Sequence, residues 1–488
     1  MDRKPNILFI MCDQFRSDVM SCAGGPARTP NLDSLAAEGI RFTDCSTVSP
    51  LCVPARISLM LGKYPHDTGA WDNARYILSP DADLWTKAIR DAGYATSVFG
   101  KLHLHSDYGD MIAYESTVRG YGFDTVNEIS GPHSSTWTRT HLSEYWKEKG
   151  VWDPFCEDMD QRKLPYAKPS PLPLEDYYDV YVGRCGREYL ERYDGEKPWF
   201  CHISFGGPHE PWDCPEPYAS LYDPSEMPDP VPLTEDRNPD RPKGVVDKNY
   251  TKPTFRTDPE NAKKLIANYC GEVTLIDEQI GAILETVKKR GEWDNTIVLF
   301  TSDHGELNGD HGMVRKRNYY RGALNVPLIV RTPETARAEN RTCDAPVNLI
   351  DVGPTLASFA GAELDYHQFG LSLRPQIEGS AERPREYILA ELSGERMYRD
   401  DEWKIVLNAN GEVYQLFHRT EDPEDRINLA GDPAYAETER ELTLKLFRAV
   451  CGNTSPKAAL MQMKEPPLSD AFNEGYLDTI AIRPRKTE

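Results

Sequence analysis

The sequence predicts an α/β protein with a central, mostly parallel sheet flanked by helices and a smaller C-terminal α+β part. Two observations predict this fold. Short apolar runs such as "NILFIM" alternate with helical patterns, which is typical of a parallel sheet covered on both faces. After about residue 380, short strands are joined by turns at "NANG" and "EDPED", which indicates antiparallel pairing.

Length and charge limit the possible organisation and partners. A chain of 488 residues exceeds the usual size of one core, so we expect a large domain over residues 1–380 and a C-terminal subdomain over 381–488. The net charge of −22 argues against nucleic acids and other polyanions as partners, because they would be repelled. A small ligand in a locally basic pocket remains compatible with this charge.

Cysteine usage and hydropathy predict the compartment. Eleven scattered cysteines form no disulfide framework, and we expect mostly free thiols in a reducing environment. The first apolar run is too short for a signal peptide, and no segment is long enough for a membrane span. The sequence therefore predicts a cytoplasmic protein without a membrane partner.

The first elements alternate strand and helix. Ile7 to Cys12 is an apolar run that suits a buried strand. A helix should begin at Pro30 with Thr29 as its N-cap and end at Gly39. A second helix should end near Gly62, and residues 84–105 read as helix, glycine turn and strand.

The rest of the large domain continues this pattern with two interruptions. Periodicity weakens over residues 106–195, apart from a helix near 175–193, and residues 211–258 are rich in proline and irregular. The other predicted elements are strands at "PWFCHISF", "NTIVLFTS" and "NVPLIVRT" and helices at 260–290, "LIDVGPTLASFAG" and 434–451.

Three apolar strands end in polar residues capable of catalysis. Asp13, His209 and the pair Asp303 and His304 follow these strands, and ligands bind beyond the carboxyl ends of strands in open α/β sheets. We expect them to converge, although a carboxylate at a strand end can also merely cap a helix. With Gln14, this set suits Ca²⁺, Mn²⁺ or Mg²⁺ rather than structural zinc.

Several basic residues have a functional and a structural interpretation. Lys101 and His103 lie two apart in "FGKLHLH", so on a strand they would share one face and reach one anion. Lys316 in "MVRKRNYY" is, on composition alone, solvated surface. His311 competes as a metal ligand, and we expect it outside the ligand set or at the surface.

Motifs along the chain carry a family resemblance. "LCVPARISLMLG" resembles the C-x-P-S/A-R motif of type I, formylglycine-dependent sulfatases, which are close to arylsulfatases and phosphonate monoester hydrolases. "PNILFIMCDQ", "GYATSVFGKLH", "GGPHEP", "TSDHGE" and "EVYQLFHRTEDPEDRINLA" match further landmarks of that family in order, from residue 5 to about 430. The resemblance implies an alkaline phosphatase-like fold with residues 1–380 as the catalytic domain.

The resemblance also assigns roles to residues. It implies that a formylglycine-generating enzyme oxidises Cys52 to Cα-formylglycine after reading Pro54 and Arg56, and that Arg56 steadies the product. One divalent metal, Ca²⁺ or Mn²⁺, would be held by Asp13, Gln14, Cys52, Asp303 and His304. The substrate contacts would be Asn73, Lys101, His103, His209 and Lys316, which gives Lys316 a function.

The match departs from the common sulfatase pattern at two metal positions. Gln14 replaces a second Asp and His304 stands where many sulfatases have Asn, which makes Mn²⁺ a competitor to Ca²⁺. The Lys-x-His pair at 101 and 103 is the sulfatase form and favours sulfate esters. We therefore expect an arylsulfatase-like hydrolase of sulfate monoesters.

The resemblance implies a mechanism as well. A hydroxyl of the hydrated aldehyde at Cys52 would attack sulfur, with Lys101 and Lys316 neutralising the sulfuryl oxygens. His209 would protonate the leaving alcohol, and His103 would then deprotonate the second hydroxyl to release sulfate.

Two alternatives stay open. The first is a phosphonate monoester or phosphodiester hydrolase that uses the same site. The second is a binding protein in which Cys52 remains a thiol. In either case we expect a small substrate or ligand and a homodimer or homotetramer.

Overall fold

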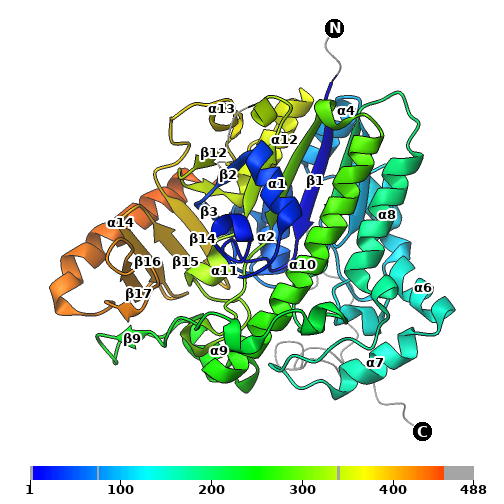
Figure 1. Cartoon of the computed structure of the whole chain (residues 1–488). Helices are drawn as coiled ribbons and strands as arrows, with labels where there is room; N and C mark the ends of the chain where they lie inside the picture. The colour runs from blue at the N-terminus through cyan, green and yellow to red at the C-terminus, as the bar shows by residue number, and fades with distance from the viewer. Residues whose placement is uncertain (1–3, 74–75, 338–340, 456–488) are drawn as a thin grey trace.

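The structure is a computed structural model that describes residues 4–73, 76–337 and 341–455 (Figure 1). It confirms the α/β class, with a large helix-covered sheet and a smaller antiparallel sheet near the C-terminus. The sequence also suggests that the proline-rich tail after residue 453 packs on a partner subunit, but this tail lies outside the described residues from residue 456 onward.

The central sheet has eight strands in the order β12-β2-β11-β10-β1-β8-β4-β6. Only β11 runs against its neighbours, so the sheet is mostly parallel as expected. The strands are β1 (Asn6–Cys12), β2 (Ile40–Phe42), β4 (Ala95–Gly100), β6 (Thr125–Glu128), β8 (Trp199–Ser204), β10 (Thr296–Ser302), β11 (Leu328–Arg331) and β12 (Arg341–Cys343). Because β1 pairs with β8 and β10 in parallel, all three carboxyl ends meet at one edge.

Helices cover both faces of this sheet (Figure 1). Leu8 and Ile10 of β1 pack toward α1 (Pro30–Glu38), α8 (Tyr178–Arg192) and α10 (Pro259–Lys289). Ile7 and Phe9, which alternate with them, pack toward α2 (Cys52–Leu61), α4 (Trp85–Asp91) and α12 (Val352–Ala360). This two-sided burial explains why β1 reads as a continuous apolar run.

The N-terminus of α1 differs from expectation in one respect. Thr29 occupies the N-cap position, but its side chain makes no capping bond. The Asp277 carboxylate on α10 accepts hydrogen bonds from the backbone N–H groups of Asn31 and Leu32 instead, at 3.1 and 2.8 Å. A partner remote in sequence therefore satisfies these free donors.

The C-terminal sheet packs against the loops that follow β10. It is an antiparallel meander of β14 (Ile388–Leu392), β15 (Glu395–Arg399), β16 (Trp403–Leu407) and β17 (Val413–His418). The helix α14 (Ala436–Gly452) covers one face through Leu442 and Leu446. On the other face, Met397 and Val406 pack with Tyr319, from the loops that follow β10.

The weakly periodic region contains helices that the sequence did not predict. They are α5 (Glu115–Gly120), α6 (His141–Lys149) and α7 (Trp152–Gln161). A capping box between Thr140 and Ser143 begins α6, so local capping stabilises a helix whose apolar period is weak.

The remaining short elements complete the fold. They are α3 (Pro65–Thr68), α9 (Val245–Tyr250), α11 (Arg321–Leu324), α13 (Arg374–Ile377) and the strand pairs β3 (Cys45–Ser46) with β13 (Val347–Asn348), β5 (Gly109–Asp110) with β7 (Thr138–Arg139), and β9 (Glu235–Asp236) with β18 (Ile427–Asn428). All eleven cysteines are free thiols, as expected. Among the described residues, none of the helices combines the length and apolar character needed to cross a bilayer.

Candidate active site

Cys52 is the first residue of α2 and is 1% exposed. Every residue of this helix is buried, and Gly62 ends it in the left-handed conformation with φ 66°. Pro54 lies in the first turn, where its missing N–H costs no hydrogen bond. Cys52 therefore lies at the N-terminus of a buried helix, where the backbone N–H groups of the first turn favour negative charge.

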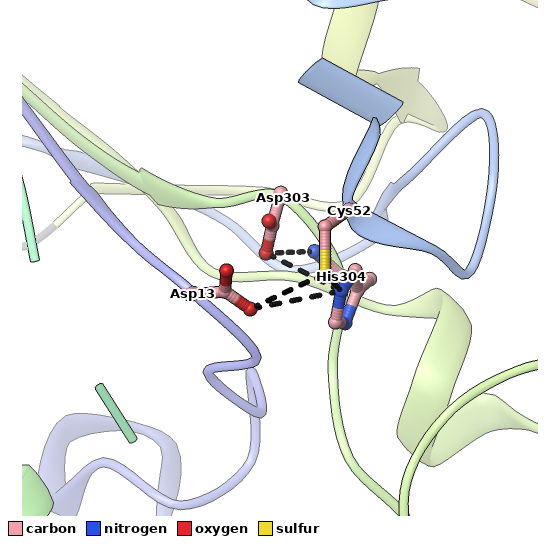
Figure 2. Close-up of side chains that lie close together, drawn as sticks. All are labelled: Asp13, Cys52, Asp303 and His304. Atoms are coloured by element: carbon pink, nitrogen blue, oxygen red, sulfur yellow. Dashed lines mark hydrogen bonds and ion pairs between the residues drawn. The ribbon is translucent and has the colours of Figure 1, made fainter. Parts of the chain in front are cut away.

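Asp13, Cys52, Asp303 and His304 converge, as Figure 2 shows. Their ligand atoms all lie within 4.8 Å of one another, and all four residues are buried. The Cys52 Sγ is 3.1 Å from His304 Nε2 and 3.7 Å from Asp13 Oδ1. Asp13 and Asp303 directly follow the central strands β1 and β10, which explains their approach across 290 residues of chain.

Two buried cations hold the outer oxygens of these carboxylates. Arg56 Nε donates to Asp303 Oδ2 at 2.6 Å, and Lys101 Nζ lies 2.6 Å from Asp13 Oδ2. Burial and Cys52 raise the pKa of Asp13, but Lys101, His209 and Arg56 outweigh them and hold it below its usual value. Both Oδ1 atoms remain directed at His304 Nε2, at 3.7 and 3.8 Å. Charged carboxylate oxygens beside an imidazole fit a hard or borderline divalent cation.

The environment of Cys52 favours its anion. Burial raises the pKa of the Cys52 thiol, but Lys316, His304 and Lys101 outweigh burial and hold the pKa well below its usual value. Burial also disfavours the charged form of His304 and so lowers its pKa, but Asp303 and Cys52 outweigh burial and raise the pKa to about 9. The pocket therefore stabilises negative charge at this position.

Lys101 and His103 reach the site by a different route from the predicted one. The strand β4 ends at Gly100, so neither residue lies on a strand. His103 adopts a left-handed backbone with φ 58°, and its side chain lines the cavity together with Cys52. The turn, rather than strand alternation, brings both side chains into one pocket.

Lys316 is buried and belongs to a polar network, so its interpretation as solvated surface is wrong. Its ammonium group contacts His209 Nε2 at 2.6 Å, Glu210 Oε2 at 3.3 Å and the amide oxygen of Gln14. His209 Nδ1 donates to the Glu210 backbone carbonyl at 2.7 Å, which leaves Nε2 facing Lys316. The backbone N–H of Gln14 donates to Asp303 Oδ1 at 3.0 Å.

A cavity of about 180 Å³ opens over Cys52. Its lining includes the predicted residues Asn73, Lys101, His103, His209 and Lys316. Asn73 Oδ1 accepts the backbone N–H of Val53 at 3.0 Å, so it also steadies the first turn of α2. His311 lies elsewhere, stacked on Tyr320 at 3.8 Å with Nδ1 3.0 Å from Thr234 Oγ1.

Sequence reasoning missed four residues of this site. Glu210 and Glu306 both accept hydrogen bonds from Gln14 Nε2, and His133 and Arg315 line the cavity. Glu210 and Glu306 stand within two positions of predicted residues, in "PHEP" and "DHGE", which was an available signal. No local signal marks His133, because its segment is only weakly periodic.

A family model described as "Sulfatase" matches residues 5–362, and a second, "N-sulphoglucosamine sulphohydrolase, C-terminal", matches residues 309–450. The chain belongs to the sulfatase family. It is a sulfuric ester hydrolase with an alkaline phosphatase-like fold, as the motifs indicated.

Relatives of this sulfatase match it over most of their length. An N-acetylglucosamine-6-O-sulfatase of Bacteroides thetaiotaomicron is 28% identical over 90% of this chain and 85% of the relative. A choline-sulfatase of Rhizobium meliloti is 30% identical with the same coverage. The phosphonate monoester hydrolase of Agrobacterium radiobacter shares the fold, with a TM-score of 0.76, 24% identity and coverage of 92% and 96%.

Proposed function

We propose that this sulfatase hydrolyses small sulfate monoesters through Cα-formylglycine formed from Cys52, with one divalent cation bound beside it. The observation that carries the proposal is the burial of Cys52 among Asp13, Asp303 and His304 below the cavity. A formylglycine-generating enzyme would act during maturation, with Pro54 and Arg56 as its recognition residues.

Asp13, Asp303, His304 and the modified Cys52 would hold Ca²⁺ or Mn²⁺. Gln14 is proposed as a further ligand. Its amide oxygen accepts a hydrogen bond from Lys316, and it would have to release Lys316 in order to bind the cation. The bound cation would supply Lewis acidity, and formylglycine would supply the hydroxyl nucleophile. Metal analysis of the purified enzyme, followed by chelation and reloading with each cation, tests the identity of the metal.

The chain's own residues would handle charge at the sulfuryl group. Lys101 and Lys316 line the cavity together with Cys52, and preorganised cations stabilise charge that develops on transferring oxygens. Arg56 holds Asp303 and donates to the Lys101 carbonyl at 2.5 Å, so it positions both partners.

Proton transfer would involve two histidines. His209 Nε2 and Lys316 Nζ share a short contact beside the cavity, and together they would deliver a proton to the leaving alcohol oxygen. His103, which lines the cavity together with Cys52, would remove the proton whose loss releases sulfate. The fixed His209 Nδ1–H bond keeps Nε2 directed at the cavity.

Mass spectrometry of tryptic peptide 42–56, from protein made in its native cell, tests the modification. The expected spectrum shows the mass loss of thiol-to-aldehyde conversion at Cys52 only. Cys45 lies in the same peptide and is the internal control, because the C-x-P-x-R pattern does not surround it. Cys52 found entirely as thiol would instead support the binding-protein alternative.

A phosphonate monoester or phosphodiester hydrolase remains the second candidate, supported by the shared fold with a phosphonate monoester hydrolase. Comparing kcat/KM on 4-nitrophenyl sulfate and 4-nitrophenyl phenylphosphonate decides between them. A larger value for the sulfate is expected, and a larger value for the phosphonate would reverse the assignment. The division at residue 380, the cytoplasmic location and a homo-oligomeric state also stay predictions.

A further inference from the structure

Arg315 forms part of the cavity wall next to Lys316 and is only 9% exposed. Its guanidinium lies over the Phe255 ring at 5.2 Å and 3.3 Å from Glu210 Oε1. This ion pair lacks hydrogen-bond alignment, and Nε and Nη2 donate to no group of the described chain. A buried guanidinium with free donors is costly unless a ligand completes its hydrogen bonds.

His133 lies on the same cavity wall and also lacks partners. Neither of its ring nitrogens is hydrogen-bonded within the described ranges. Its ring packs edge to face with His209 at 6.3 Å, so it borders the position of the leaving group. Burial lowers the pKa of His133 to about 3, which leaves a neutral ring with one donor and one acceptor.

The other cations of the cavity already have partners. Lys101 pairs with Asp13, and Lys316 bonds to Gln14 and Glu210. Arg317 is held by both oxygens of Asp72, at 3.2 and 2.5 Å. Glu210 accepts bonds from Gln14 and Lys316 at Oε2, and its Oε1 lies 3.3 Å from Arg315 Nε without forming a hydrogen bond.

The backbone of Arg315 is strained, as is that of the neighbouring Arg317 at φ 69°. Arg315 has φ 71°, in the left-handed region that favours glycine. The strain places a large cationic side chain where glycine would be the unstrained choice.

We propose that Arg315 and His133 form a subsite for a second anionic group, a carboxylate or another sulfate, on the alcohol portion of the substrate. The inference rests on the proposed sulfate-ester site over Cys52, which would receive the ester sulfate. A substrate with a cationic alcohol is disfavoured, because the face of Phe255 that could stack on an ammonium group carries Arg315.

Binding of non-hydrolysable sulfonates tests this subsite by calorimetry on the metal-loaded enzyme. The dianions are 3- and 4-sulfobenzoate and benzene-1,3- and 1,4-disulfonate, and the monoanionic reference is 4-carbamoylbenzenesulfonate. We expect at least one dianion to bind about 10–100-fold more tightly than the reference, as one charged hydrogen bond allows. The two dianion classes distinguish carboxylate from sulfate as the preferred group.

Variants identify the residue responsible. Arg315→Gln should reduce the affinity ratio, defined as the affinity for the best dianion divided by that for the monoanionic reference, to below about 3. Arg315→Gly, which suits φ 71°, provides a second variant if the first folds poorly. Arg317→Gln is the matched control, because Arg317 lines the same cavity but is paired with Asp72, and it should keep the ratio.

Equal binding of dianions and reference, binding of no dianion, or a ratio unchanged in both Arg315 variants would overturn the proposal. Turnover of 4-nitrophenyl sulfate is measured separately. Failure of the proposed function therefore appears as lost turnover, while failure of the subsite appears in the affinity ratio.

Discussion

Replacing Arg56 by Met should destabilise the enzyme mainly when no metal is bound. Arg56 is 2% exposed and donates to Asp303 Oδ2 at 2.6 Å, the Lys101 carbonyl at 2.5 Å and Ser204 Oγ at 3.1 Å. Methionine would fill much of the volume but leave these acceptors, including a buried carboxylate, without their donor. Breaking a buried ion pair in this way costs about 3–5 kcal/mol.

This cost converts into a measurable shift in melting temperature. An unfolding entropy of about 2.1 cal/mol/K per residue is roughly 1 kcal/mol/K for a chain of this length, so Tm should fall by about 3–5 °C. The assay is differential scanning calorimetry of the Cys52 form in EDTA and again in excess Ca²⁺ or Mn²⁺. A bound cation would restore positive charge beside Asp13 and Asp303. The difference in Tm between Arg56→Met and the wild type should therefore be smaller in excess metal than in EDTA.

Arg331→Met is the matched control for this experiment. Arg331 is equally buried at 1% exposure, and it donates to the carbonyls of Trp293 and Thr296 at 2.7 and 3.0 Å, away from the cluster. Its loss in Tm should be the same with and without metal. A Tm of Arg56→Met in EDTA within about 1 °C of the wild-type Tm, or a difference in Tm that metal leaves unchanged, would refute the reasoning.

Three further predictions concern catalysis, strand spacing and pH. His209→Ala should lower kcat about 10²–10⁴-fold on alkyl sulfates but far less on 4-nitrophenyl sulfate, whose leaving group needs no proton; equal losses would exclude an acid role. Gly100→Ala should cost several kcal/mol in denaturant unfolding, because a Cβ at φ 100° would lie 1.9 Å from the Ser204 carbonyl oxygen, and a variant of wild-type stability would contradict this. Burial lowers the pKa of His66, but its bonds to Glu391 outweigh burial and raise it. The charge of His66 therefore contributes stability that is complete below the unfolded pKa of about 6.5 and is lost as pH rises through the higher folded pKa. In the His66→Gln variant, Tm should fall less steeply than in the wild type as pH rises above about 6. A variant whose plot of Tm against pH runs parallel to that of the wild type would contradict this assignment.

The sequence by itself determined the central strands β1, β4, β8, β10 and β11, the longest helices and the candidate site residues that follow those strands. The apolar run of β1 and its parallel neighbours indicated where the strands end, and this placed Asp13 and Asp303 at one edge. The C-x-P-x-R motif identified Cys52, because the motif is local in the chain. Helix α10 was predicted within a few residues, since 31 residues carry a strong apolar period.

Only the tertiary structure decided which partner each polar side chain uses. The α1 cap comes from Asp277 rather than Thr29, and Lys316 is buried beside Gln14 rather than solvated. Arg315 reads as one more basic residue in "VRKRN", yet among the described cations that line the cavity it alone has buried donor groups without a hydrogen-bond partner. The physical reason is that hydrophobic periodicity is a local property of the chain, whereas burial and hydrogen-bond partners depend on segments that meet only after the chain has folded.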